Sequence, residues 1–154
     1  MKNKLDNFIK TSLDKLYSEE PNLIKIDISD LIEVHNAERS IVFRFGHYMI
    51  NLLERDEDLR LYQVDAEYNR NLYDIKRIMI DDKLKNVYPD LVIHRRGTSD
   101  NLLVIEFKTW WNPDQNFDIK KIKAFMKPSG GYAYKFGLLI KIDRTSPELC
   151  WIKL

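Results

Sequence analysis

Apolar side chains recur every three or four residues in two stretches of the first third of the chain. The spacing over residues 4–17 predicts an amphipathic helix. Its apolar positions are Leu5, Phe8, Ile9, Leu13 and Leu16. Pro21 prevents this helix from continuing. A longer helix is predicted from about Asp30 to about Glu54. Gly46 inside it costs about 1 kcal/mol relative to alanine, which favours close packing at that point.

Alternation of apolar and polar positions replaces the helical period in the middle of the chain. Residues 61–69 alternate almost without exception and predict a half-buried strand. Two apolar strands follow, at 88–94 and 101–109, joined by a polar turn that contains a glycine. Pro89 fits the first position of its strand, where a missing N–H group does least harm. The polar stretch 70–86 is interpreted as a connection with a short helix.

The last third of the chain returns to the helical period and ends on strands. Residues 114–127 open with good helix-start residues and predict a helix. A glycine-containing segment ends it, and residues 135–142 predict a strand. Residues 148–154 are interpreted as an edge strand.

This order of elements predicts the fold class. Three consecutive strands can form an antiparallel meander, and the helix that follows can cross over the sheet to the next strand. We therefore expect an α/β three-layer sandwich with a small mixed sheet, an αβββαβ core over about 30–142 and an extra N-terminal helix within 1–20. A chain of 154 residues favours a single domain over 1–154.

Charge and composition narrow the partners and the compartment. The chain has 25 Lys and Arg against 24 Asp and Glu, so a nucleic acid would have to contact a local basic patch. Cys150 is the single cysteine, which excludes an internal disulfide framework and a cysteine-rich zinc site. The first residues contain no apolar signal region, and no apolar run is long enough for a membrane span. We expect a soluble cytoplasmic protein with no membrane partner.

Charged residues interrupt the two central strands. Glu106 and Lys108 are two residues apart and should project from the same face of their strand, away from Ile105 and Phe107. The neighbouring strand can bring Asp90 alongside them. Two adjacent carboxylates favour a divalent cation, and oxygen ligands select Mg²⁺ or Mn²⁺. A lysine beside the ion can orient water and stabilise developing charge, as phosphodiester hydrolysis requires. The alternative is a solvated ion pair worth under about 1 kcal/mol.

These residues carry a resemblance to a known family. The Pro-Asp pair at 89–90 and the sequence Glu-Phe-Lys at 106–108, in this order of elements, resemble the PD-(D/E)XK nuclease superfamily, which has the restriction endonuclease-like fold. The resemblance covers most of residues 30–142 and is strongest to small stand-alone members. It implies that Asp90 and Glu106 are metal ligands, together with the backbone carbonyl of Phe107.

The resemblance also assigns the remaining catalytic roles. Lys108 would position the attacking water. The superfamily often adds a glutamate from the helix before the meander, and Glu38 is the candidate here, with Glu33 as the second choice. Several further charged residues are candidates for nucleic-acid contact, although each could equally lie on a solvated strand end, loop or helix face. They are Glu67, Arg70, Arg95, Arg96, Lys120 and Lys121.

The expected function is a Mg²⁺- or Mn²⁺-dependent endonuclease that hydrolyses DNA. One small domain leaves little room for a separate sequence-reading module, so structure-directed or weakly sequence-specific cleavage is expected. Cutting both strands would require a homodimer or two encounters, and a partner subunit is the alternative source of substrate recognition. RNA stays open as a substrate, because nothing in the sequence distinguishes the two sugars. The alternative function is a catalytically inactive nucleic-acid-binding or protein-interaction module of the same fold, which the near-zero net charge favours.

Overall fold

The computed structural model describes residues 1–25, 31–68, 70–71, 74–75, 77–81, 83–112 and 114–154. For residues 31–36, 70–71 and 74–75 it describes the backbone alone. Within this part of the chain, no helix is both long enough and apolar enough to cross a membrane.

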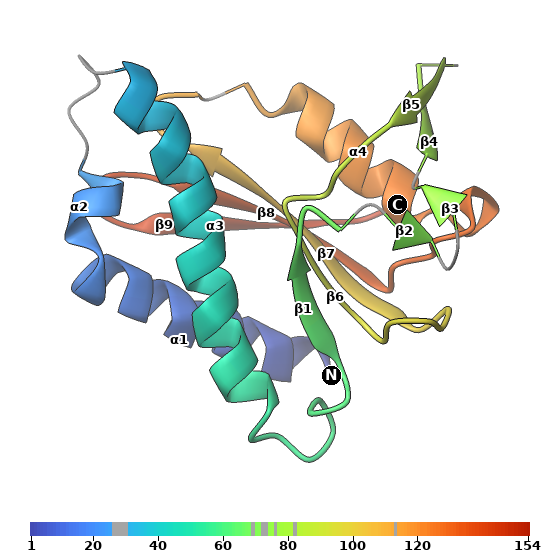
Figure 1. Cartoon of the computed structure of the whole chain (residues 1–154), viewed down its shortest axis with the longest axis horizontal. Coiled ribbons are helices and arrows are strands. Elements are labelled where there is room, and N and C mark those ends of the chain that lie inside the picture. Colours follow the sequence, from blue (N-terminus) through green and yellow to red (C-terminus); the bar gives the residue numbers. More distant parts are fainter. Residues whose placement is uncertain (26–30, 69, 72–73, 76, 82, 113) are drawn as a thin grey trace.

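A five-stranded mixed sheet forms the centre of the molecule, in the order β1-β6-β7-β8-β9 (Figure 1). Its strands are β1 (Gln63–Ala66), β6 (Leu91–His94), β7 (Asn101–Thr109), β8 (Phe136–Ile142) and β9 (Pro147–Ile152). Strands β7 and β8 are parallel, and the other neighbours are antiparallel. The antiparallel meander of the first three strands and the mixed character of the sheet confirm the sequence predictions.

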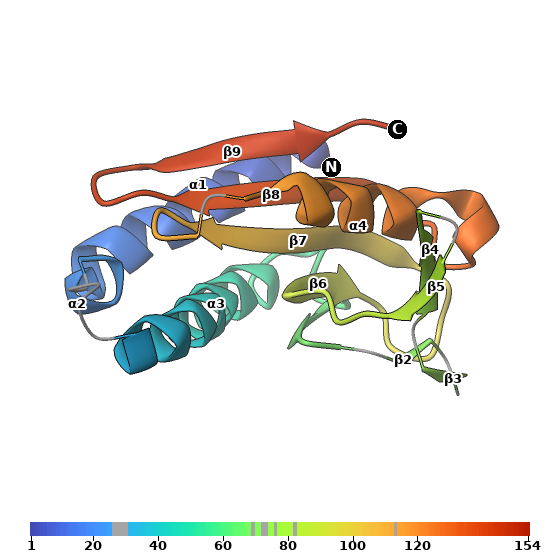
Figure 2. The ribbon, with the colours of Figure 1, turned by 90° about the horizontal axis from the view of Figure 1, so that it is seen from above.

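Helices cover both faces of this sheet, which gives the expected three layers (Figure 2). They are α1 (Lys2–Glu19), α2 (Pro21–Ile24), α3 (Leu31–Leu53) and α4 (Asn116–Met126), and a 3-10 turn follows at Pro128–Gly130. Helices α1, α2 and α3 pack on one face and α4 on the other, so that Figure 1 shows α4 above the sheet and α1 below it. Helix α1 is the predicted N-terminal addition, and α2 is a short turn that the sequence pattern did not indicate.

Alternate residues of the central strands supply the two apolar layers. Leu91 and Ile93 belong to the core under α1 and α3, whereas Val92 belongs to the core under α4. Strand β7 is covered on both faces, and all but one of its residues are buried. A charged side chain on β7 therefore has little access to water.

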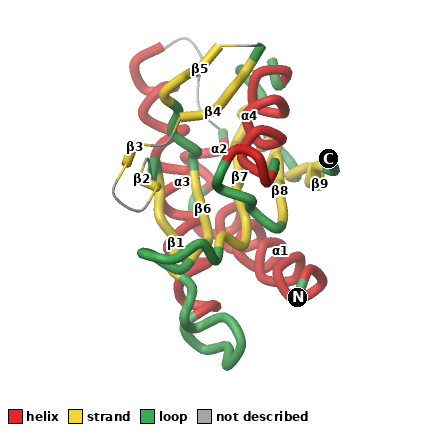
Figure 3. The backbone as a smooth tube through the Cα atoms, turned by 90° about the vertical axis from the view of Figure 1, so that its right-hand side faces the viewer, coloured by secondary structure: helices red, strands yellow, loops and turns green. Residues whose placement is uncertain are grey.

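The short helix predicted within 70–86 is wrong. Strands β4 (Arg77–Ile80) and β5 (Lys83–Asn86) form an antiparallel hairpin there, and β2 (Arg70–Asn71) pairs with β3 (Asp74–Ile75) (Figure 3). Ile78 and Ile80 are buried in the core under α4, while Arg77 and Met79 of the same strand are exposed. This alternation fits a strand, and the tertiary contact with α4 overrides the local helical spacing.

Element ends differ from the predictions by a few residues. The strand predicted at 61–69 is limited to β1, and the one at 88–94 begins at Leu91. On α4, Phe117 is 43% exposed. The helix instead turns two charged residues, Asp118 and Lys121, toward the sheet.

Two glycines mark places where helices approach the sheet closely. A Cβ at Gly46 would lie 3.0 Å from Leu91 Cδ1, which confirms the close packing expected inside α3. A Cβ at Gly137 on β8 would lie 2.3 Å from Ile122 Cγ2 and 2.5 Å from Met126 Sδ, both on α4. The gap between α4 and β8 therefore has no room for a methyl group.

We expect Gly137→Ala to lower the free energy of unfolding by about 1–3 kcal/mol, because the added methyl overpacks this gap. Gly46→Ala is the matched control, since its single close neighbour is the end of one leucine side chain and the helix gains propensity. That control should change stability by less than about 1 kcal/mol. Urea unfolding of both variants measures the difference, and a Gly137→Ala variant as stable as the parent would contradict it.

Candidate functional site

The sheet brings Asp90, Glu106 and Lys108 to one place, as the sequence predicts. Asp90 directly precedes β6, and Leu91 pairs with Ile105, so Asp90 lies beside Glu106 on the neighbouring antiparallel strand. Its Oδ2 accepts a hydrogen bond of 2.8 Å from the backbone N–H of Phe107. This bond fixes the Asp90 carboxylate against β7.

Glu106 is a buried carboxylate, with 1% of its surface exposed. Its Oε2 lies 2.5 Å from the Nζ of Lys121, a residue of α4. Lys121 Nζ also donates a hydrogen bond of 3.1 Å to the carbonyl oxygen of Tyr88. The Glu106 carboxylate is thus held and neutralised by the ammonium of Lys121.

The two carboxyl groups disfavour each other's charge. Burial raises the pKa of Glu106 well above its ordinary value, the charge of Asp90 raises it further, and Lys121 opposes both. Burial also raises the pKa of Asp90, against the opposing effects of Lys121 and the Phe107 N–H. Both groups hold protons more tightly than free carboxyl groups do. A site of this kind favours a bound cation.

Lys108 projects from the same face of β7 as Glu106, as the spacing predicts, and reaches the same helix. Its Nζ lies 2.8 Å from Oδ2 of Asp118 on α4, and both side chains are largely buried. Ile105 and Phe107 face the opposite core, under α1 and α3. Two lysine–carboxylate pairs of opposite polarity therefore join β7 to α4.

Glu38 reaches the site from α3. Its Oε2 accepts a hydrogen bond of 3.2 Å from Thr109 Oγ1 at the end of β7. Burial and the neighbouring charge of Asp90 raise the pKa of Glu38, and the bond from Thr109 opposes them. The backbone of Glu33 belongs to α3, but its side chain lies outside the described part of the chain.

An open cavity of about 630 Å³ lies beside these carboxylates. Its walls come from α3, β1, the residue before β6 and the loop after β7. The residues that line it are Glu38, Arg39, Val42, Ala66, Glu67, Asp90 and Asn112. Lys108 and Thr109 line a second hollow of about 380 Å³ toward β8 and β9. The ends of β6 and β7 are therefore accessible from two sides.

The donors here suit a small hard cation. Among the described residues, no three His, Cys, Asp or Glu side chains assemble into a metal cluster. The chain would contribute two carboxylates, Asp90 and Glu106, and leave the remaining positions to water and substrate oxygens, as is usual for Mg²⁺. The buried Glu106 carboxylate beside Asp90 fits such an ion. A role for the Phe107 carbonyl stays a prediction.

The two nucleic-acid-contact candidates after β1 and on β2 differ in what the structure describes of them. Glu67 lines the large cavity, adopts a left-handed backbone conformation with φ 48°, and its N–H bonds to the carbonyl of Asp90 at 3.2 Å. Its exposed carboxylate lies 3.6 Å from the Arg39 Nε. Glu67 thus borders the site. The side chain of Arg70 lies outside the described part of the chain.

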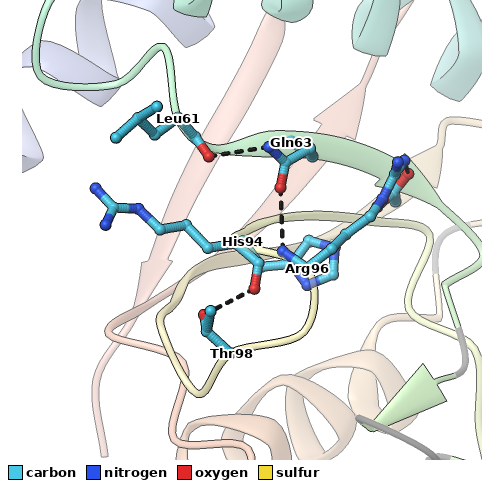
Figure 4. Close-up of polar contacts among 7 residues, drawn as sticks. Leu61, Gln63, His94, Arg96 and Thr98 are labelled. Atoms are coloured by element: carbon cyan, nitrogen blue, oxygen red, sulfur yellow. Dashed lines mark hydrogen bonds and ion pairs between the residues drawn. The ribbon is translucent and has the colours of Figure 1, made fainter.

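Arg95 and Arg96 follow the C-terminal end of β6, whereas Asp90 precedes its N-terminal end. Figure 4 shows Arg96 in contact with residues of β1, which stabilises the loop after β6. Arg96 donates from Nε to Asp65 at 2.7 Å, and its backbone N–H bonds to Gln63. Arg95 lies over the Tyr62 ring. His94, the last residue of β6, is buried, and its Nε2 lies 2.8 Å from Asp65 Oδ2.

The two lysine candidates of α4 have different surroundings. Lys120 forms an exposed pair with Asp81 at 2.8 Å, so it stays on the surface. Lys121 was a candidate for surface contact with nucleic acid, but the helix turns it inward onto Glu106. Sequence reasoning did not expect Lys121 to contact Glu106, and it did not indicate Asp118 at all. The signal was present, because Asp118, Lys121, Ile122 and Phe125 share one helical face.

No protein-family model, no curated protein and no solved structure matches the chain. A function is therefore inferred from the chemistry of the site. What the site offers is one buried carboxylate, one partly exposed carboxylate, two lysines and a half-buried glutamate beside an open cavity.

We expect Lys121→Met to lower the free energy of unfolding by about 3–5 kcal/mol near pH 8, since it leaves a buried carboxylate pair without its counter-charge. The pKa of Glu106 is raised in the folded state, so ionising this side chain lowers the free energy of unfolding. At low pH the side chain is protonated, and this loss of stability disappears. The deficit should therefore shrink as the pH falls toward about 5.

Lys120→Met is the matched control, because it removes an exposed pair from the adjacent position. It should cost less than about 1 kcal/mol at either pH. Urea unfolding at both pH values compares the variants. Equal losses for the two, or a Lys121→Met deficit independent of pH, would show that Glu106 does not depend on Lys121.

Proposed function

We propose that the protein is a metal-dependent nuclease of the PD-(D/E)XK type that hydrolyses phosphodiester bonds of DNA. The observation that supports this most is the pair of carboxylates, buried Glu106 and partly exposed Asp90, at adjoining strand ends beside an open cavity. Such a pair costs free energy unless a positive charge neutralises it, and a metal ion can supply that charge as well as Lys121 does. Lys108 supplies an amine on the same face of β7.

Each side chain has a role in this reaction. Asp90 and Glu106 would hold Mg²⁺ or Mn²⁺, with the Phe107 carbonyl as a further ligand. When bound, the ion supplies Lewis-acid stabilisation of the phosphoryl charge and lowers the pKa of water. Lys108 orients the attacking water and donates to the developing negative charge. Glu38 lines the cavity, and burial together with the charge of Asp90 raises its pKa, so its carboxylate is a stronger base than a free one.

The cavity favours a polymeric substrate over a small enclosed molecule. It is open, so a strand can lie across Asp90 and Glu38, which line it. Glu67 and Arg39 at its border would contact the substrate or the water around it. With one site per chain, a homodimer or a partner subunit is expected to provide cleavage of both strands.

One observation favours the alternative of a catalytically inactive module. Lys121 already neutralises Glu106, and a metal-free nuclease fold that binds nucleic acid or protein would have such a pair. Measurements of DNA cleavage and of metal binding distinguish the nuclease from the inactive module.

We expect cleavage of DNA that requires Mg²⁺ or Mn²⁺ and stops in EDTA. The assay offers supercoiled plasmid, linear duplex, single-stranded DNA, a branched junction and RNA, and quantifies products on gels. Asp90→Asn and Glu106→Gln should abolish cleavage, because each removes a charged ligand. Lys108→Ala should reduce it by about 100-fold or more, since a group that stabilises the transition state is lost.

Matched controls separate chemistry from folding. Asp58→Asn removes an exposed carboxylate, and Lys10→Ala removes an exposed lysine of α1, both from surface ion pairs. They should cleave at the parent rate. If the parent cuts none of the substrates and binds neither ion, the nuclease proposal fails and the inactive module is favoured.

A further inference from the structure

We propose that Lys121 is an internal counter-ion that takes the place of the divalent cation, and that its ammonium must leave Glu106 when the ion binds. This inference rests on the proposed function. It assigns to α4 a residue that controls how tightly the site holds its metal.

The surroundings of the ammonium support this assignment. Lys121 is 8% exposed, and its Nζ lies 2.5 Å from Glu106 Oε2 and 3.1 Å from the carbonyl oxygen of Tyr88. Tyr88 is two residues before Asp90, so the ammonium lies among oxygens at the same strand ends that carry both carboxylates. Carboxylate and carbonyl oxygens are the ligands of hard cations. The lysine thus occupies surroundings that suit a metal ion.

Lys121 contributes positive charge to Glu106 as well as a close contact. Its Nζ lies 2.5 Å from Glu106 Oε2, within the distance of a charge-assisted hydrogen bond. A divalent cation at the same oxygens supplies a higher positive charge, so it can take over the neutralisation of Glu106.

The displaced ammonium has a second partner within reach. Asp118 lies one helical turn before Lys121 on α4, where side chains three residues apart are neighbours. Asp118 is buried, and its Oδ2 lies 2.8 Å from Lys108 Nζ without an aligned hydrogen bond. Lys121 can thus pass from Glu106 to Asp118 by a change of rotamer, with α4 in place.

The exchange also affects Lys108. Asp118 holds Lys108 in the metal-free protein. When Lys121 neutralises Asp118, Lys108 loses its need for that partner and becomes available to the water at the site. Loading of the ion and release of the catalytic amine are then one coupled event.

The test observes the lysine side chains of the full chain directly, by NMR of protein labelled with ¹³C and ¹⁵N in lysine. Addition of Mg²⁺ should shift the Cε and Nζ signals of Lys121 and Lys108 and leave those of Lys120 unchanged. Assignment uses Lys121→Met and Lys120→Met. Calorimetry with Mg²⁺ alone, without nucleic acid, gives the affinity of each protein.

We expect Lys121→Met to bind Mg²⁺ at least about tenfold more tightly than the parent, because no ammonium competes, and Lys120→Met to bind as the parent does. Should Lys121→Met be unfolded without metal, Mg²⁺ should restore its fold; if it does not, the parent NMR titration decides. Mg²⁺ binding that leaves the Lys121 signals unmoved, or weaker binding by Lys121→Met, overturns the inference while the nuclease proposal stands. No binding by any variant overturns both.

Discussion

The burial of Glu106 beside Asp90 is the constraint on which the site depends. A carboxylate on a strand covered on both faces has no water to solvate it, and the neighbouring carboxylate adds repulsion. Lys121 from α4 neutralises the charge of Glu106, and Asp118 from the same helix neutralises the charge of Lys108. These two pairs make α4 part of the site as well as a cover for the sheet.

The parallel pairing of β7 and β8 accounts for how α4 comes to lie there. A parallel connection has to cross the sheet, and the crossing segment here is α4, pressed onto β8 at Gly137. The helix turns both apolar and charged residues toward β7 as a result. α3 performs the corresponding task on the other face, where Gly46 permits close approach and Glu38 reaches Thr109. The site thus lies where both helical layers meet the ends of β6 and β7.

Most of the architecture and half of the site could be predicted from the sequence. Periodicity gave the sheet and three main helices, and the strand period put Glu106 and Lys108 on one face. Their partners were missed because Lys121 lies in a lysine-rich run that is typical of a solvated surface, and rotation about the helix axis alone separates it from Lys120. The β4–β5 hairpin was missed because its strand pattern depends on contact with α4. Local sequence contains the period of an element, whereas the partner that it buries is a tertiary property.

The same physics connects stability and function in this site. A carboxylate pair that a lysine neutralises is tolerable in the folded protein. Replacing the pair by apolar residues would usually cost nothing or stabilise a fold. Retaining buried Glu106, partly exposed Asp90 and two lysines next to an open cavity is the more expensive arrangement. The proposed reaction, in which a cation would take the place of the Lys121 ammonium and Lys108 would be released toward the substrate, would account for that cost.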